Sequence, residues 1–251
     1  MENARIIDYV KEVLQSLPLD WLNLTTHRLD IYNEKLAKSE FLDEFSELFD
    51  KNEASNQALS QLPTAYDYIR LGHPLSCVLE WAIGEINDLK SRNVISFSSK
   101  SAPILAILRK NHLDKKQTQI IYNGIAPAYL EFEELRTVYN YDFELRHISK
   151  VEEIAKFKGS TIYVSQHVEF FRIDITFLDE SIKVDFFVNL HKSLGSVLIV
   201  NREIDEVYIS EIQHVRRRET IAMTPADCLL ALELLTGKSK IILHGSQPDS
   251  N

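Results

Sequence analysis

The N-terminal quarter of the chain carries the apolar spacing of amphipathic helices. Apolar side chains recur at helical intervals from Ile6 to Leu17, where Pro18 ends the pattern, and again from Glu34 to Phe49. Residues 1–62 hold twelve Asp or Glu against six Lys or Arg, so about −6 of the net charge lies here. The sequence therefore predicts a helical appendage over 1–62, whose apolar faces either pack on the rest of the chain or bind a partner protein.

After Leu62 short apolar strands alternate with amphipathic helices. Such alternation is typical of βα units and of a largely parallel sheet. We expect an α/β fold, a three-layer, mostly parallel sheet with flanking helices, over residues 63–245, followed by a frayed tail over 246–251. The expected strands are Asn93–Phe97, Thr118–Tyr122, Tyr141–Arg146, Thr161–Ser165, Phe170–Phe177, Lys183–Leu190 and Ser196–Val200. The expected helices are Ser76–Leu89, Ala102–Lys110, Pro127–Tyr139 and a last one that begins at Pro225.

Two local features refine this picture. The stretch from Thr161 to Val200 has little room for crossover helices, which need about a dozen residues each, so part of the sheet should be antiparallel or simplified. At the last helix, Thr224 offers a capping hydroxyl, Pro225 suits the first position and Gly237 closes the helix.

Composition limits the function classes. A chain of 251 residues with 45% hydrophobic content buries a sizeable core. Its net charge of −9 argues against nucleic-acid binding as the main activity, because such surfaces are built on clustered Lys and Arg. The triplet Arg216–Arg218 is a local exception that indicates a solvated loop or a weak anion site, and we favour the loop.

Two cysteines, Cys77 and Cys228, suggest neither a disulfide framework nor a metal-binding quartet, which fits a reducing cytoplasm. The chain shows no secretory signal and no transmembrane run. We therefore expect a cytoplasmic protein without membrane contact.

One run of residues carries a specific resemblance. Tyr68-Ile69-Arg70, Gly72-His73-Pro74, Leu79-Glu80 and Phe97-Ser98-Ser99 follow one another without gaps at the spacing of Tyr-x-Arg-x-x-Asn-Pro-Thr, Leu-Glu and Phe-Ser-Ser-Gly-Met-x-Ala. These motifs belong to the pyridoxal-phosphate enzymes of cysteine and methionine metabolism, the cystathionine synthase and lyase family, which this stretch resembles. The resemblance implies pyridoxal phosphate, an amino-acid substrate, and lyase or transferase chemistry through a lysine Schiff base.

The same resemblance assigns the residues that would hold the cofactor phosphate. Ser99, Lys100 and Ser101 occupy the place of the family's phosphate-binding turn before a helix, where backbone N–H groups favour anions. Lys100 replaces a glycine there, which adds charge but removes backbone freedom. Tyr68 and Arg70 correspond to the pair that reaches the phosphate of a neighbouring subunit, so a homodimer is implied.

Further matches concern the cofactor ring. Tyr122 stands where the family's tyrosine stacks on the ring. Ile173–Phe177 resembles Val-Asp-Asn-Thr-Phe, so that Asp174 would pair with the pyridine nitrogen and Thr176 would contact the cofactor. Lys192, one residue short of the family spacing from Asp185, is the candidate for the Schiff-base lysine.

The resemblance covers residues 62–240 and becomes loose after Arg146. We expect no residue of this sequence to take the role of the substrate-binding arginine, which the family carries in its C-terminal domain. A non-catalytic relative that acts as a dimeric or partner-binding scaffold is therefore an alternative. A second alternative is a metal-dependent enzyme of the nucleotidyltransferase type, with Asp174 and Asp185 as paired carboxylates.

Overall fold

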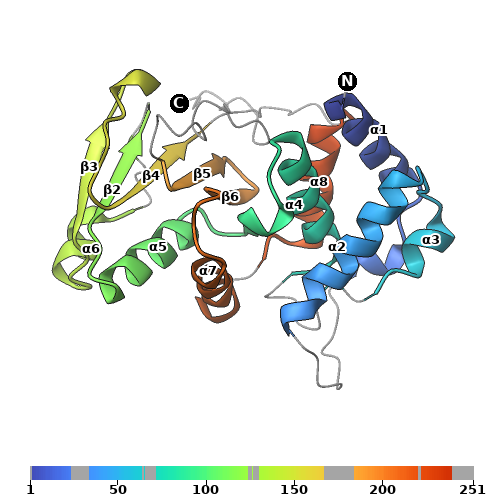
Figure 1. Cartoon of the computed structure of the whole chain (residues 1–251), viewed down its shortest axis with the longest axis horizontal. Helices are drawn as coiled ribbons and strands as arrows, with labels where there is room; N and C mark the ends of the chain where they lie inside the picture. Colours follow the sequence, from blue (N-terminus) through green and yellow to red (C-terminus); the bar gives the residue numbers. More distant parts are fainter. Residues whose placement is uncertain are drawn as a thin grey trace, which may run out of the picture.

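The computed structural model describes residues 2–23, 34–63, 65, 72–123, 126, 130–166, 184–219 and 222–238. Within them a six-stranded sheet is flanked by helices, which confirms the predicted α/β class (Figure 1). The strands are β1 (Val94–Phe97), β2 (Thr118–Tyr122), β3 (Phe143–His147), β4 (Ser160–Ser165), β5 (Phe186–His191) and β6 (Gly195–Val200). The helices are α1 (Glu2–Gln15), α2 (Glu34–Asp50), α3 (Asn56–Ser60), α4 (Pro74–Ile86), α5 (Ala102–Leu113), α6 (Phe132–Thr137), α7 (Glu206–Glu219) and α8 (Pro225–Leu235), with 3-10 turns at Leu19–Leu22, Ser91–Asn93 and Val151–Glu153.

The sheet has the order β1-β6-β5-β4-β2-β3. Strand β2 pairs in parallel with β3 and β4, and β4 pairs in parallel with β5. Strand β6 is antiparallel to both of its neighbours, β5 and β1. Five of the described strands thus point one way and β6 is reversed, in agreement with the expectation that part of the sheet between Thr161 and Val200 is antiparallel. The strand expected at Phe170–Phe177 lies outside the described residues.

One sequence interpretation is wrong. The arginine triplet does not form the favoured loop, because Arg216–Arg218 lie in the last turn of α7. This helix begins after Asp205, whose carboxylate accepts the Val207 N–H at 2.6 Å, and it buries Ile209 and Ile212 on the sheet. The helix forms because its apolar positions recur every three to four residues, although most of its surface is polar.

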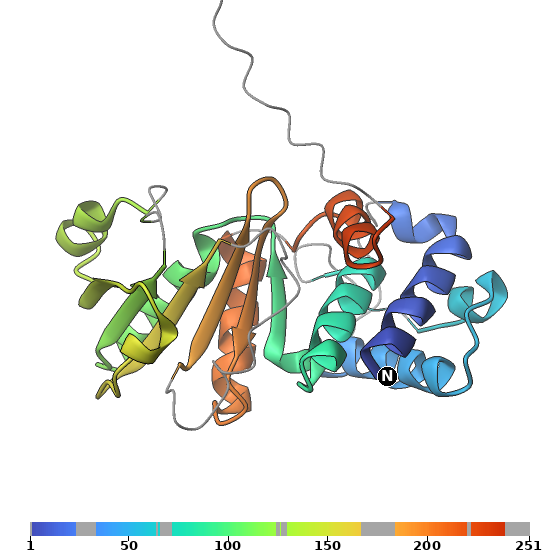
Figure 2. The same cartoon turned by 90° about the horizontal axis from the view of Figure 1, so that it is seen from above.

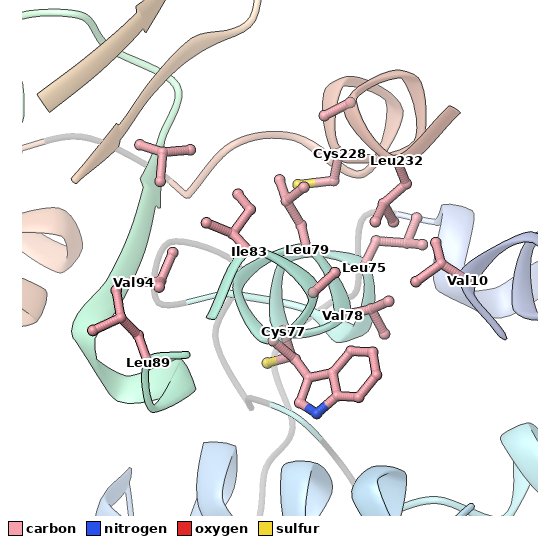
Figure 3. Packing of buried hydrophobic residues seen from close by; sticks show 14 of the residues in the cluster. Val10, Leu75, Cys77, Val78, Leu79, Ile83, Leu89, Val94, Cys228 and Leu232 are labelled. Carbon is pink, nitrogen blue, oxygen red and sulfur yellow. The ribbon is translucent and has the colours of Figure 1, made fainter. Parts of the chain in front are cut away.

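The sheet separates two hydrophobic clusters. Helices α5, α6 and α7 pack against one face, whereas α4, α8 and the N-terminal helices lie together beyond β1 and share a cluster with buried residues of the other face (Figure 2). In the second cluster α4 is central: Leu75, Val78 and Leu79 are buried between Val10 of α1 and Leu232 of α8 (Figure 3). The N-terminal helices therefore share a core with α4 and α8, while a folding boundary near residue 62 stays a prediction.

The predicted cap of the last helix is confirmed. Thr224 Oγ1 accepts the Asp227 N–H at 3.1 Å, Pro225 occupies the first turn, and Gly237 follows the helix with φ +72°. Among the described residues no helix combines the length and apolarity needed to cross a membrane.

Candidate functional site

The candidate site lies at the carboxyl edge of the parallel strands. Strands β1, β2, β4 and β5 end here at Phe97, Tyr122, Ser165 and His191. In open α/β sheets ligands bind outside this edge, because loops and helix N-termini gather there. Five residues assigned from the sequence belong to it: Ser99, Lys100, Ser101, Tyr122 and Lys192.

The turn between β1 and α5 holds the first group. Ser99 Oγ accepts the backbone N–H groups of Ser101 and Ala102 at 3.2 and 3.1 Å, so the Ser99 side chain caps α5 from two residues before its N-cap residue, Ser101. Lys100 is not among the described residues with positive φ, so the side chain that replaces the family glycine sits on an unstrained backbone.

The second group is the hairpin between β5 and β6. His191 pairs with Gly195, and Lys192 is exposed in the turn between them. Lys100 Nζ donates to the carbonyl oxygen of Lys192 at 2.7 Å, although the two residues are 92 positions apart. The fold thus brings together the turn before α5 and the candidate lysine.

Gly195 makes this approach possible, and sequence reasoning missed it. A Cβ at Gly195 would lie 2.2 Å from the carbonyl oxygen of Phe97, and its φ is +94°. Both facts favour glycine. Next to it, Ser196 Oγ donates to the carbonyl oxygen of Ser99 at 2.6 Å, which ties the hairpin to the capping turn. The sequence signal that could have revealed it is a single glycine between two apolar strands.

His191 is buried beneath the turn. Its Nδ1 accepts the N–H groups of Ser193 and Leu194, each at 3.2 Å, so it shapes the turn that presents Lys192. Burial, and then the nearby Lys100 ammonium, lowers the pKa of His191 below its ordinary value. The imidazole is therefore neutral near pH 7 and acts as an acceptor.

Tyr122 ends β2 at the same edge but away from the hairpin. Strand β4 lies between β2 and β5, which separates Tyr122 from the end of β5 by about 10 Å at the usual strand spacing. Its ring packs edge-on against His147 with centroids 5.3 Å apart. The structure thus places Tyr122 at the expected edge without bringing it into contact with Lys192.

Ser165 is a residue that the sequence did not single out. It ends β4, is 1% exposed, and its Oγ has no hydrogen-bond partner among the residues that the structure describes. A buried hydroxyl without a partner is costly, and such groups mark places where a ligand or water completes the bonding.

Four assigned residues, Tyr68, Arg70, Asp174 and Thr176, lie outside the described residues. Asp185, the other carboxylate of the metal alternative, lies at the opposite edge of the sheet, before β5. Its Oδ2 accepts the Thr161 N–H at 2.7 Å. Across the part of the chain that the structure describes, no group of three His, Cys, Asp or Glu could hold a metal ion.

An open hollow of about 750 Å³ also lies at the amino edge, away from Lys192. It is lined by Asp114, Lys115, Lys116, Gln117, Asp142 and Lys158. Because it lies before β2, β3 and β4, it is not continuous with the carboxyl-edge site.

The donor chemistry of the carboxyl edge fits a phosphorylated aldehyde cofactor. Lys192 supplies an exposed amine, Lys100 supplies positive charge at the N-terminus of α5, and Ser165 supplies an unused hydroxyl. The N–H groups of Ser101 and Ala102 already bind Ser99, so phosphate would compete with that cap.

No protein-family model matches the sequence, and no curated protein matches it. Solved structures do resemble the fold. Cystathionine gamma-lyase from Lactobacillus plantarum, crystallised with L-serine, aligns with a TM-score of 0.50 and 10% identity over 92% of this chain and 64% of that chain. The metB protein of Corynebacterium glutamicum aligns at 0.47, with 13% identity over 92% and 64% of the two chains. Yeast cystathionine gamma-lyase aligns at 0.46, with 12% identity over 92% and 63%.

The chain spans less than two thirds of the length of these proteins. At such low identity the likeness to the Lactobacillus plantarum protein shows the fold alone.

Proposed function

We propose that this chain is a pyridoxal-phosphate protein related to the sulfur amino-acid lyases and transferases, and that Lys192 is the lysine to which the cofactor attaches. The observation that carries the proposal is the 2.7 Å hydrogen bond from Lys100 Nζ to the Lys192 carbonyl. It joins the two separate parts of the sequence resemblance at the edge of the sheet where ligands bind.

The residues of the site have distinct roles in this proposal. Lys192 offers its amine from the turn, and His191 holds that turn by accepting two N–H groups. Lys100 and the N-terminus of α5 favour the phosphate electrostatically. When bound, pyridoxal phosphate supplies an electron sink for a carbanion beside the amino group of an amino-acid substrate.

The roles that we propose for the remaining residues rest on the sequence resemblance. Asp174 would face the pyridine nitrogen, Thr176 would contact the cofactor, and Tyr122 would lie against the ring. Tyr68 and Arg70 would reach the phosphate of a second subunit, which makes the active form a homodimer. Both cysteines are buried free thiols, in keeping with a cytoplasmic location.

The test is covalent labelling. Protein incubated with pyridoxal phosphate should show a visible absorption band, and borohydride followed by peptide mass spectrometry should place the label on Lys192. Lys192→Ala should abolish both signals. Lys150→Ala should leave both unchanged, because Lys150 is an exposed lysine that follows β3 at the same edge. A label on Lys100, or no label, would contradict the proposal.

A second candidate function is a non-catalytic scaffold that keeps the fold. The capping of α5 by Ser99 favours it, because two N–H groups of the turn are already satisfied without a phosphate. Thermal unfolding separates the two candidates. A cofactor that binds the native protein raises the melting temperature by mass action, whereas a scaffold shows no shift at any cofactor concentration.

The Ser99→Ala variant provides a second test that separates the two candidate functions. If Ser99 only caps the helix, the substitution lowers the free energy of unfolding by about 1 kcal/mol and frees no functional site. If phosphate binds at the turn, the variant keeps or gains cofactor affinity, because two N–H groups become available to the phosphate.

A further inference from the structure

Strand β3 forms one end of the sheet. Its inner side pairs with β2 over Phe143 to His147, and no other described strand pairs with its outer side (Figures 1 and 2). An unpaired strand edge presents backbone donors and acceptors that a second chain can complete.

The backbone register defines which groups face outward. The N–H of Ile148 donates to the Tyr122 carbonyl at 3.0 Å, so Ile148 faces β2. Because backbone groups alternate along a strand, Glu144 and Arg146 also face β2. The N–H and C=O groups of Leu145 and His147 therefore face away from the sheet.

The edge sequence is complementary to itself. An antiparallel pair centred on Leu145 would place Leu145 opposite its own copy, with both exchanging hydrogen bonds. Glu144 would then lie opposite Arg146 of the second copy, and Arg146 opposite the second Glu144. These would be non-hydrogen-bonded pairs, in which side chains approach most closely, so both ion pairs could form.

Both side chains have capacity for such pairs. Glu144 is exposed and makes no hydrogen bond or ion pair with any described residue. Arg146 donates from Nη2 to the Glu153 carbonyl at 2.9 Å, which leaves the other guanidinium donors available.

Exposed apolar side chains near the start of β3 extend the surface that a second chain could cover. Leu113, Val138 and Tyr139 are 69%, 67% and 55% exposed. Tyr139 stacks on Tyr141 with ring centroids 5.7 Å apart, two residues before the strand. Exposed apolar side chains beside an open strand edge favour burial against another surface.

We propose that two copies of this chain associate by antiparallel pairing of their β3 edges about Leu145. Arg136 Nη2 donates to the outward Phe143 carbonyl at 3.4 Å, which limits pairing at that end and makes the contact short. The association is therefore weak and concentration-dependent. This proposal concerns the β3 edge alone and does not depend on the roles proposed for Tyr68 and Arg70.

Charge exchange tests the pairing by sedimentation velocity over a range of protein concentrations. Glu144→Arg alone and Arg146→Glu alone each place like charges opposite each other, and each should weaken this association about tenfold or more. An equimolar mixture of the two variants should associate again, because each supplies the charges that the other lacks. The double variant, Glu144→Arg with Arg146→Glu, should self-associate like the parent.

The backbone contribution has its own test. Leu145→Pro removes an outward N–H without removing a bond to β2, so it should abolish the association while the far-ultraviolet circular dichroism and melt remain those of a folded protein. Glu152→Arg, an exposed acid outside the strand, is the matched control and should change nothing. Single charge variants that associate like the parent, or a mixture that stays as dissociated as its components, would overturn the proposal.

Discussion

Lys38 Nζ in α2 lies 2.5 Å from Glu80 Oε2 in α4, and the Glu80 carboxylate is wholly buried. Glu80 Oε1 accepts both the N–H and the hydroxyl of Ser96 in β1, at 2.8 and 2.7 Å. One ion pair thus connects the N-terminal helices, the central helix and the strand that leads into the Ser99 turn.

Lys38→Ala should strongly destabilise the protein. Removing one partner of a buried pair leaves an uncompensated charge, and this costs about 3–5 kcal/mol of the free energy of unfolding. Urea unfolding measures the change. Lys51→Ala is the control: Lys51 pairs with Glu47 at 3.1 Å on the surface, and its loss should cost well under 1 kcal/mol. Equal effects for the two variants would show that the buried pair contributes no more than the exposed one.

Deleting residues 2–55 tests whether the N-terminal helices are separable. Tyr9, Phe45 and Phe49 pack against the Trp81 ring, so the deletion exposes apolar surface of α4 as well as the Glu80 carboxylate. We expect the truncated protein to aggregate and to lack a cooperative melt. A soluble truncated protein with a sharp melt would instead support an independent domain after residue 62.

Gly195→Ala should lower the free energy of unfolding by several kcal/mol. The new Cβ would overlap the Phe97 carbonyl and also meet the Ser98 backbone, while φ stays positive. Gly237→Ala provides the matched control, because its φ is also positive but no atom of the described residues lies within 4 Å of the new Cβ. That variant should lose only about 1 kcal/mol from the backbone conformation. The difference between the two variants measures the crowding beneath the hairpin.

Acidification should lower the free energy of unfolding through the protonation of His191. Its folded pKa lies below 6.5 because of burial and of Lys100, so between the two pKa values the unfolded state binds more protons. The contribution of His191 is therefore present above the unfolded pKa and is lost as pH falls through 6.5 towards the folded pKa. Unfolding free energies measured across this range should show a smaller loss for Lys100→Met and an unchanged loss for Lys100→Arg. The opposite order would exclude Lys100 as a cause.

Local patterns predicted much of the fold. Strand β2 has the expected bounds and α5 begins at the expected Ala102, because a short apolar run predicts the strand and Ser101 with Pro103 in the first turn predicts the helix start. The scarcity of room for crossover helices between Thr161 and Val200 predicts an antiparallel or simplified part of the sheet, and β6 is the antiparallel strand there. Helix α7 was missed because its apolar residues, such as Ile209 and Ile212, are sparse within a polar sequence.

The site was less predictable because it depends on contacts between distant segments. Sequence spacing placed Lys100 and Lys192 in separate motifs, and only the fold shows their hydrogen bond. The capping of α5 by Ser99 depends on side-chain geometry that a serine-rich turn does not specify. Whether the Ser165 hydroxyl finds a hydrogen-bond partner among the described residues depends on the packing around β4, and no sequence motif predicts that packing.

The position of β1 in the sheet affects the order in which the protein folds during its synthesis. This strand comes first in the chain but joins the sheet through β6, with Val94 opposite Ile199 and Phe97 opposite Ser196. A nascent chain emerges from its N-terminus, so β1 has no described strand to pair with until the hairpin has been synthesised. Such a distant pairing slows folding, because a long loop must close before the contact forms. The turn that carries Ser99 and Lys100 therefore reaches its native position late in folding, after the hairpin that carries Lys192 has been synthesised and has paired with β1.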